Sequence, residues 1–581
     1  MTKTSLRLSP DEQAMLAGEG TRAERMAMGL IARLASITGA TELLPITRAH
    51  IDGCLYHGQA SVDFARTMAE AGGQVRVPTT LNVGIIDLLH PELFRGDPAV
   101  AAAGREMMAH YRAMGCRQTW TCAPYQLVER PSLGEQVAWA ESNAIVFCNS
   151  VLGARTERYG DFIDLAAAIT GRVPNTGLHR DEGRLGQVLV RVRNVSPEEI
   201  GEDLFFAALG HMVGRLVGTR IPVIEGVEAA REDDLKALGA ASASAGAVAM
   251  FHMVGVTPEA PDLTTAFGGR TPERTFEIGP DEMAAALAEL STPTTQPLGT
   301  ISVGTPHFSY DEFRRVSDLF AGRRVASGVA FYISTGRDVL ARVDAEGWGD
   351  QLRATGVTIV TDTCTYLTPI LRERPGAVMT NSAKWAWYAP GNLGYEVIFA
   401  TLDDCVESAV QGSRVTRPLP RRTREAPAAH TVSPSAGTTP PEDLGSPRAT
   451  LIAGPASGEV LALNEPLSFW GGVREHDGSI IDVHHPQHGR NVAGRILVMP
   501  GGRGSSSSSS VLAELVRGGV APAGIVLRTP DPILALGAMV GELLYERTVP
   551  MCVLPPGEYG TAQSAAQIRI DGDTGQVIAL S

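Results

Sequence analysis

The sequence lacks several features that would place it in common protein classes. It has no run of about 18 apolar residues, so no transmembrane helix is predicted. None of its seven cysteines forms a CxxC pair, which leaves neither a zinc ribbon nor a thioredoxin-like motif. No Walker-type phosphate loop is present. The 50 basic residues are outnumbered by 64 acidic residues, which argues against a nucleic-acid partner.

The N-terminus and the cysteine usage indicate a reducing compartment. The opening stretch, MTKTSLRLSPDEQ, is too polar for a secretory signal. The cysteines are odd in number and widely spaced, which is typical of proteins whose thiols stay reduced. We therefore expect a cytoplasmic protein that has neither a membrane partner nor a nucleic-acid partner.

A segment rich in Pro, Ser, Thr and charge divides the chain. Residues 417–447 show no apolar periodicity and are predicted to form a linker. They separate a large region, 1–416, from a small one, 448–581. In both regions short apolar runs alternate with helical patterns, which predicts an α/β fold with mainly parallel sheets. The predicted strands include 144–150, 185–192, 297–304, 325–334, 357–363, 495–500 and 523–529.

The segment 501–510, GGRGSSSSSS, follows a predicted strand and precedes a predicted helix. A glycine-rich loop that opens a helix presents free backbone N–H groups and the positive end of the helix dipole to an anion. The alternative is a flexible serine tract without a function. The flanking strand and helix favour an anion-binding loop.

Four of the seven cysteines lie in polar, turn-rich stretches: Cys54, Cys122, Cys148 and Cys364. A single cysteine is more often a small core residue than a ligand. Cysteines that are dispersed in the sequence and converge on folding would suit an iron or iron–sulfur centre. The spacing alone does not show whether these four converge.

Several longer motifs resemble those of the aconitase X family, and the resemblance extends over almost the whole chain. It implies a large multi-layer α/β body, similar to the catalytic region of aconitase, followed by a small swivelling domain. The motifs are TCAPY (121–125), WAESNAIVFCNSVLGART (139–156), GRVPNTGLH (171–179), GTPHFS (304–309), TDTC (361–364), TNSAK (380–384) and PGGRGSSSSS (500–509).

The resemblance implies a hydro-lyase. One branch of the family, usually of two subunits, dehydrates mevalonate 5-phosphate. A fused branch dehydrates cis-3-hydroxy-L-proline to Δ1-pyrroline-2-carboxylate. The single chain favours the fused branch, and so do Thr305 and Cys148, where the two-subunit proteins tend to carry Cys and Ala. We therefore expect a small hydroxy amino acid as the substrate and no obligatory second subunit.

The resemblance also implies an iron–sulfur cluster, in this branch a [2Fe–2S] centre that acts as a Lewis acid on the leaving hydroxyl. The proposed metal ligands are Cys122, Cys148 and Cys364, with Cys54 in reserve. A serine of the swivelling domain is the base in the wider superfamily, which here corresponds to Ser505 or Ser507. Lys384 and His57 are further catalytic candidates. Substrate binding is assigned to Arg155, Arg503, Asn149, Ser150 and His307.

Two other classes of function stay open at this stage. A zinc hydrolase could use the histidines of 484–488, although no metal-ligand spacing is present there. A protein without catalytic activity could clamp an anion between its two domains.

Overall fold

The computed structural model describes residues 6–372, 376–415, 446–572 and 574–580. The predicted linker, 417–447, lies outside the described residues except for its last two positions, so the division at that linker stays a prediction. Among the described residues, no helix is long and apolar enough to cross a membrane.

The N-terminal part of the chain is built around a three-stranded parallel sheet. Its strand order is β3 (Thr79–Leu81), β2 (Ala49–Ile51), β4 (Ala138–Trp139). Apolar helix faces pack around it and form one continuous core with the sheet. The helices are α2 (Arg22–Thr38), α3 (Gln59–Glu70), α4 (Pro98–Ala113) and α6 (Ile163–Thr170).

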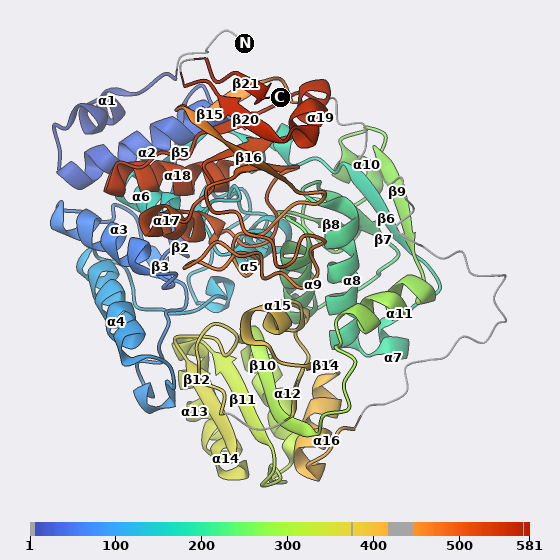
Figure 1. Cartoon of the computed structure of the whole chain (residues 1–581). Coiled ribbons are helices and arrows are strands. Elements are labelled where there is room, and N and C mark those ends of the chain that lie inside the picture. Colours follow the sequence, from blue (N-terminus) through green and yellow to red (C-terminus); the bar gives the residue numbers. More distant parts are fainter. Residues whose placement is uncertain (1–5, 373–375, 416–445, 573, 581) are drawn as a thin grey trace.

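A four-stranded parallel sheet follows, in the order β8 (His252–Met253), β7 (Pro222–Glu225), β6 (Val188–Val192), β9 (Arg274–Ile278). Helices α8 (Glu202–Val217) and α9 (Glu232–Ala245) lie beside it (Figure 1). The two helices approach closely because glycine occupies the contact. A Cβ added to Gly210 would lie 2.2 Å from the Leu238 carbonyl oxygen.

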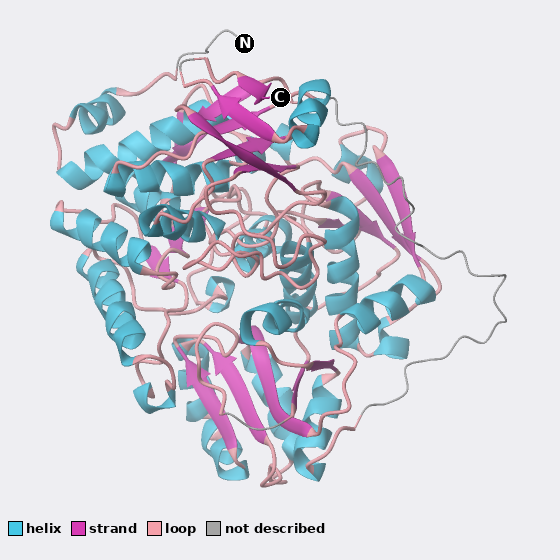
Figure 2. Cartoon of the chain, in the orientation of Figure 1, coloured by secondary structure: helices cyan, strands magenta, loops and turns pink. Residues whose placement is uncertain are grey.

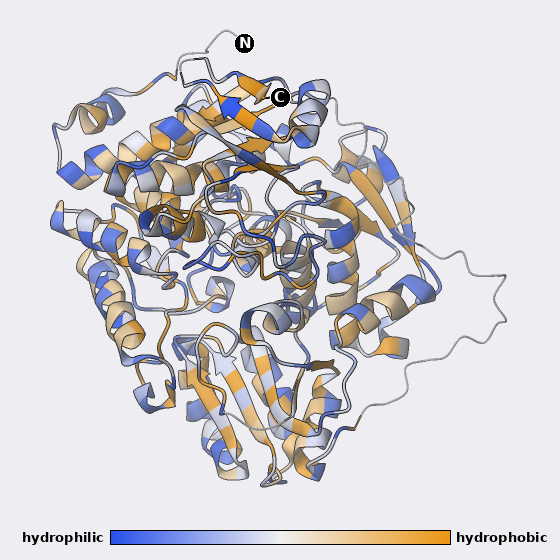
Figure 3. Ribbon diagram, viewed as in Figure 1, coloured by the Kyte–Doolittle hydropathy of each residue, from blue (hydrophilic) through white to orange (hydrophobic). Residues whose placement is uncertain are grey.

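The third sheet has five parallel strands, at the bottom of Figure 1. Figure 3 shows its strands banded in orange, and its central strand, β10, is buried along its whole length. The strand order is β12 (Val357–Thr361), β11 (Ala330–Thr335), β10 (Leu298–Phe308), β13 (Ala377–Thr380), β14 (Val397–Phe399). The helices around it are α12 (Tyr310–Phe320), α13 (Arg337–Ala345), α14 (Trp348–Thr355), α15 (Ala383–Leu393) and α16 (Leu402–Gln411).

The C-terminal part forms a seven-stranded sheet whose four central strands are parallel. The order is β15 (Ala449–Ile452), β19 (Met551–Val553), β18 (Gly524–Leu527), β17 (Ile496–Met499), β16 (Ala456–Ala462), β20 (Gln567–Ile570), β21 (Val577–Leu580). Its helices are α17 (Ser508–Gly518), α18 (Pro532–Tyr545) and α19 (Pro556–Ser564).

Helices α17 and α18 dock the C-terminal part onto the N-terminal part. Glu514 of α17 accepts a hydrogen bond (2.8 Å) from the backbone N–H of Ala60, in the first turn of α3. A carboxylate at this position stabilises a helix N-terminus. Arg33 of α2 forms an ion pair (2.7 Å) with Glu542 of α18.

Strand ends from three sheets meet at the centre of the molecule, where Figure 2 shows the loops gathered. Asp52 follows β2, Cys364 follows β12, and Lys384 follows β13. The segment 500–507 follows β17. Ligand sites in parallel sheets form at these carboxyl ends. The predicted α/β fold with mainly parallel sheets is confirmed.

One predicted strand is wrong. Residues 144–150 lie in helix α5 (Ser142–Phe147) and the π-helical turn Cys148–Leu152 that continues it. The Glu141 carboxylate caps this helix by accepting a hydrogen bond (2.8 Å) from the Ala144 N–H. All six residues of α5 are buried, so the run is apolar on every side and its periodicity does not distinguish helix from strand.

Candidate active site

A small chamber lies where these strand ends meet. Its volume is about 20 Å³, room for about one water molecule. A ligand as large as proline therefore fits only after one wall moves. The lining residues are Asp52, Leu55, Asn82, Val83, Cys122, Glu141, Cys364, Tyr366, Leu367, Lys384, Trp470, Ser505 and Ser507.

The chamber region holds a group of metal-ligand atoms. One donor atom from each of Cys122, His307 and Cys364 lies within 4.8 Å of the others, and all three residues are buried. His307 is near the end of β10, and Cys364 lies in the loop after β12. Thiolates and an imidazole are the donors that suit iron, iron–sulfur or zinc centres.

His307 already has hydrogen-bond partners at both ring nitrogens. Nδ1 lies 3.1 Å from the Thr121 hydroxyl, and Nε2 lies 3.2 Å from the Thr363 carbonyl oxygen. Burial lowers the pKa of His307 to about 4, so the ring is neutral near pH 7. A neutral imidazole is a competent ligand, but His307 would have to exchange one of these hydrogen bonds for the metal.

The two cysteines face each other. The hydrogen bond with Cys122 and the burial of the site raise the pKa of the Cys364 thiol well above its usual value. Without a cation the Cys364 thiol is therefore protonated. A bound metal ion would displace the proton, because thiolates are the ligating form.

Lys384 and Glu141 form a buried ion pair on the chamber wall. The Lys384 Nζ atom lies 2.7 Å from a Glu141 carboxylate oxygen. Burial acts to lower the pKa of Lys384, but the Glu141 charge outweighs it and raises this pKa. Lys384 is therefore protonated. It is the one cationic side chain among the described residues that line the chamber.

The serine tract contacts two buried carboxylates. The hydroxyls of Ser506 and Ser507 donate to Asp52, at 2.7 and 3.2 Å. Ser507 also donates to Asp161 at 3.3 Å, and Ser510 donates to Asp161 at 2.5 Å. Burial, and then the charge of Glu141, raise the pKa of Asp52 to about 7.

An aromatic cluster forms another part of the wall. The rings of Tyr366 and Trp470 are 5.9 Å apart at 79°. Tyr388 lies behind Trp470, with centroids 4.6 Å apart and an edge-to-face angle of 88°. Such perpendicular packing holds each ring in a fixed orientation.

Family models identify the chain. Models of the aconitase X first, second, third and swivel domains match residues 5–182, 186–288, 298–411 and 447–579. The chain belongs to the aconitase X family. Its chamber is built by the first, third and swivel domains, and the second domain contributes no lining residue among those described.

Two kinds of aconitase X relative are similar to the chain. A cis-3-hydroxy-L-proline dehydratase of Pseudomonas aeruginosa is 44% identical over 420 residues, which are 71% of each chain. A phosphomevalonate dehydratase large subunit of Methanosarcina mazei is 33% identical and matches over 70% of this chain and 97% of its own. The crystal structure of Thermococcus kodakaraensis aconitase X has a TM-score of 0.63 at 31% identity, and it covers 70% of this chain.

The structure brings together six of the residues that the sequence singles out. Cys122, Cys364, Lys384, Ser505 and Ser507 line the aconitase X chamber, and His307 stands beside the two cysteines. His307, which is predicted to bind substrate, lies in the group of metal-donor atoms.

Two of the predicted metal ligands lie outside the donor group. Cys148 is fully buried in an apolar cluster that includes Tyr125, Phe147 and Ala154. The Cys54 thiol lies 3.2 Å from the Asn82 carbonyl oxygen. Both have the surroundings of core cysteines.

The predicted substrate-binding residues other than His307 make contacts within the protein. Arg155 pairs with Asp181, and Arg503 pairs with Asp482 at 2.7 Å. The Asn149 amide donates to backbone carbonyls of Thr156 and Ala249, and the Ser150 hydroxyl accepts from the Phe251 N–H. None of these four lines the chamber.

His57 also lies outside the chamber lining. Its ring is 6.4 Å from the Trp470 ring, and burial lowers its pKa to about 3. The ring is therefore neutral and packs behind the aromatic wall.

Sequence reasoning missed Asp52, Glu141, Tyr366 and Trp470. For the two carboxylates a signal existed, since Asp52 follows β2 directly and Glu141 lies two residues after the end of β4. Polar residues at the ends of parallel strands are site candidates. The two strands are only three and two residues long, too short to predict from periodicity.

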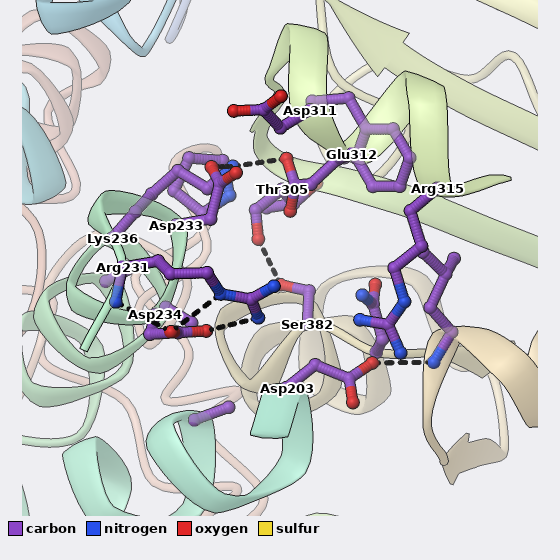
Figure 4. Close-up of a pocket in the computed structure, with 18 of the residues that line it drawn as sticks. Asp203, Arg231, Asp233, Asp234, Lys236, Thr305, Asp311, Glu312, Arg315 and Ser382 are labelled. Atoms are coloured by element: carbon purple, nitrogen blue, oxygen red, sulfur yellow. Dashed lines mark hydrogen bonds and ion pairs between the residues drawn. The ribbon is translucent and has the colours of Figure 1, made fainter. Parts of the chain in front are cut away.

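A larger cavity of about 560 Å³ lies between the second and third domains (Figure 4). Lys384 lines both this cavity and the chamber. Charged side chains of the larger cavity form ion pairs: Arg231 with Asp234 at 3.0 Å, and Lys236 with Asp233 at 2.9 Å. None of the metal-donor side chains lines it.

Proposed function

We propose that the chain is a hydro-lyase that converts cis-3-hydroxy-L-proline into Δ1-pyrroline-2-carboxylate. The observation that carries this proposal is the higher identity to the Pseudomonas dehydratase, 44% against 33% for the phosphomevalonate enzyme subunit. The swivel domain on the same chain supports it, because the phosphomevalonate enzyme of Methanothermobacter thermautotrophicus has a separate small subunit that is 36% identical over 125 residues. We expect the chain to work without a second subunit.

The chamber contains groups for each step of such a reaction. Dehydration removes the proton at C2 and the hydroxyl at C3, and the resulting enamine tautomerises to the imine. A seryl oxygen of Ser505 or Ser507 is the proposed base. Helix α17 begins directly after Ser507, and its N-terminal N–H groups stabilise negative charge on that oxygen. Lys384 is the proposed partner of the substrate carboxylate.

Cys122 and Cys364 are the proposed metal ligands, with His307 as the third. When bound there, an iron centre would supply Lewis acidity for departure of the C3 hydroxyl. A [2Fe–2S] cluster is the form that the family resemblance implies. Such a cluster takes four protein ligands, and the group found here offers three. Analysis of iron and acid-labile sulfide in the purified protein decides the type of centre.

All seven cysteines are free thiols, which fits a reducing cytoplasm. A cytoplasmic location stays our expectation.

Substrate deuterated at C2 tests the proposed reaction. The product, trapped by borohydride as proline, is expected to contain no deuterium at C2, because the C2 deuteron leaves before the imine forms. Trapped product that retains the label at C2, or no conversion by the iron-loaded enzyme, would contradict this chemistry.

A further inference from the structure

Asp52 is a buried carboxylate without a cationic partner. Its side chain is 3% exposed and lines the chamber. It accepts hydrogen bonds from the Asn82 amide and from the hydroxyls of Ser506 and Ser507, all of them neutral donors. No Lys, Arg or His among the described residues forms an ion pair with it. A buried charge without a counter-ion is costly for a folded protein.

The other carboxylate that lines the chamber does not share this property. Glu141, the other carboxylate of the chamber, is paired with Lys384. In the larger cavity, Figure 4 shows Asp233 and Asp234 beside cationic side chains. Asp161 is also buried without an ion pair, but it does not line the chamber. Among the described residues, Asp52 is therefore the one chamber-lining carboxylate without a cationic partner, and it faces the space that a ligand would enter.

A ligand cation would supply the missing partner. Asp52 is not in the group of metal-donor atoms. The substrate of the proposed function carries one cation, the secondary ammonium of its ring. Tyr366 and Trp470 also line the chamber, and aromatic rings attract cations and pack well against saturated rings.

We propose that Asp52 is the counter-ion of the substrate's secondary ammonium, and that Tyr366 and Trp470 form the wall for its five-membered ring. This inference rests on the proposed function and adds the residues that select the substrate. The ammonium then lies at Asp52 while the carboxylate lies at Lys384. A substrate with a phosphate and no ammonium would meet the Asp52 charge unmatched, which disfavours it.

A matched pair of unreactive ligands tests the role of Asp52. L-proline and (S)-tetrahydrofuran-2-carboxylate share the ring and the carboxylate, but the second has an ether oxygen in place of the ammonium. Calorimetric titration of the iron-loaded wild-type enzyme should show proline binding tighter by about 10-fold or more. In Asp52→Asn, which keeps the size and one acceptor oxygen but removes the charge, this ratio should fall to near one.

Asp161→Asn is the matched control. Asp161 is also buried and also accepts from Ser507, but it does not line the chamber. Its substitution should leave the proline-to-ether ratio unchanged, even where both affinities fall. A proline-to-ether ratio that is unchanged in Asp52→Asn would overturn the proposal. This includes the case in which only turnover falls, because Asp52 would then act on the serine hydroxyls and not on the ammonium. Equal affinities in the wild type would overturn it without any variant, so the test does not depend on the folding of Asp52→Asn.

A third ligand tests the aromatic wall. Sarcosine keeps a secondary ammonium and a carboxylate but has no ring. The wild type should prefer proline, and Trp470→Leu should reduce that preference by about 10-fold, since the indole removes the ring methylenes of proline from water. Asp52→Asn should leave the ratio of proline affinity to sarcosine affinity unchanged. An unchanged ratio in Trp470→Leu would remove the ring wall from the proposal.

These titrations need no turnover, so they separate the two hypotheses. An enzyme that shows the predicted ratios but does not dehydrate hydroxyproline would sustain the ammonium site and refute the proposed reaction. An enzyme that dehydrates hydroxyproline but shows no dependence on Asp52 would sustain the reaction and refute the site.

Discussion

Cys122 and Cys364 are far apart in the sequence, yet their thiols meet because a loop of the first domain faces the end of β12 in the third domain. Each cysteine by itself has the burial of a core residue. Their shared position, with His307, is what indicates a metal centre. The sequence marked both cysteines by their polar neighbours, but it marked Cys148 in the same way and kept Cys54 in reserve, since local polarity does not report distance in space.

Cys364→Ser should lose the iron and its visible absorbance while the fold persists, because a serine hydroxyl is a poor ligand for this class of metal. Cys148→Ala is the matched comparison, since Cys148 lies in an apolar cluster away from the donor group. Iron content and circular dichroism of both variants measure the difference. Normal iron in Cys364→Ser, or loss of iron from Cys148→Ala alone, would contradict the ligand set.

Asp52→Asn should stabilise the ligand-free enzyme, and more so at high pH. Burial raises the pKa of Asp52 to about 7 in the folded protein, from 3.8. The folded state therefore holds a proton that the unfolded state loses, and the stability from this group falls as pH rises through that interval. Asparagine does not ionise, so Asp52→Asn removes this pH-dependent loss of stability. The melting temperature of Asp52→Asn should exceed that of the wild type by more at about pH 7.5 than at about pH 5. A variant that melts below the wild type at both pH values would contradict the unpaired charge.

At the scale of elements, the site depends on where parallel strands end. The order strand, glycine-serine loop, helix at 495–518 was predictable, because the apolar run and the glycines are both in the sequence. Helix α5 was not, because a run that is buried on all sides has no period. The register of the serine tract was also not predictable, since six identical side chains differ only by the direction in which the backbone aims them.

The structure separates the serines by position. Ser505 and Ser507 line the chamber, whereas Ser506 contacts Asp52 but is not part of the lining. Alanine at the position that supplies the base should lower kcat by about 10²–10⁴-fold with a small change in KM. Ser506→Ala should cost far less. Steady-state constants for the three variants decide this, and near-normal kcat in both Ser505→Ala and Ser507→Ala would place the base elsewhere.

At the scale of the whole molecule, three domains close around a chamber with room for about one water molecule. Substrate entry therefore requires a wall to move, and the swivel domain is the natural candidate because it carries Trp470 and the serine tract. Family motifs predicted the large body and the swivel domain. The joint contribution of three domains to one chamber was beyond sequence reasoning, since it depends on how separately folded sheets dock.

A disulfide between the first domain and the swivel domain should stop turnover. A Cβ added to Gly160 would lie 3.3 Å from the Ser509 Cβ, close to the distance of about 3.5–4.5 Å in disulfides. The oxidised double variant Gly160→Cys, Ser509→Cys should lose at least about 100-fold in kcat/KM, and a reductant should restore it. Both single variants, oxidised in the same way, serve as controls. Full activity of the cross-linked protein would show that substrate enters without a swivel motion.

The most direct test of the account is a comparison of kcat/KM for cis-3-hydroxy-L-proline and mevalonate 5-phosphate, measured on the same iron-loaded preparation. Among the described residues, the chamber lining has one carboxylate without an ion-pair partner, Asp52, for an ammonium, and one cation, Lys384, for a carboxylate. We predict turnover of the hydroxyproline, exceeding that of mevalonate 5-phosphate by at least about 10³-fold. A preference for the phosphate would contradict both the proposed reaction and the role of Asp52.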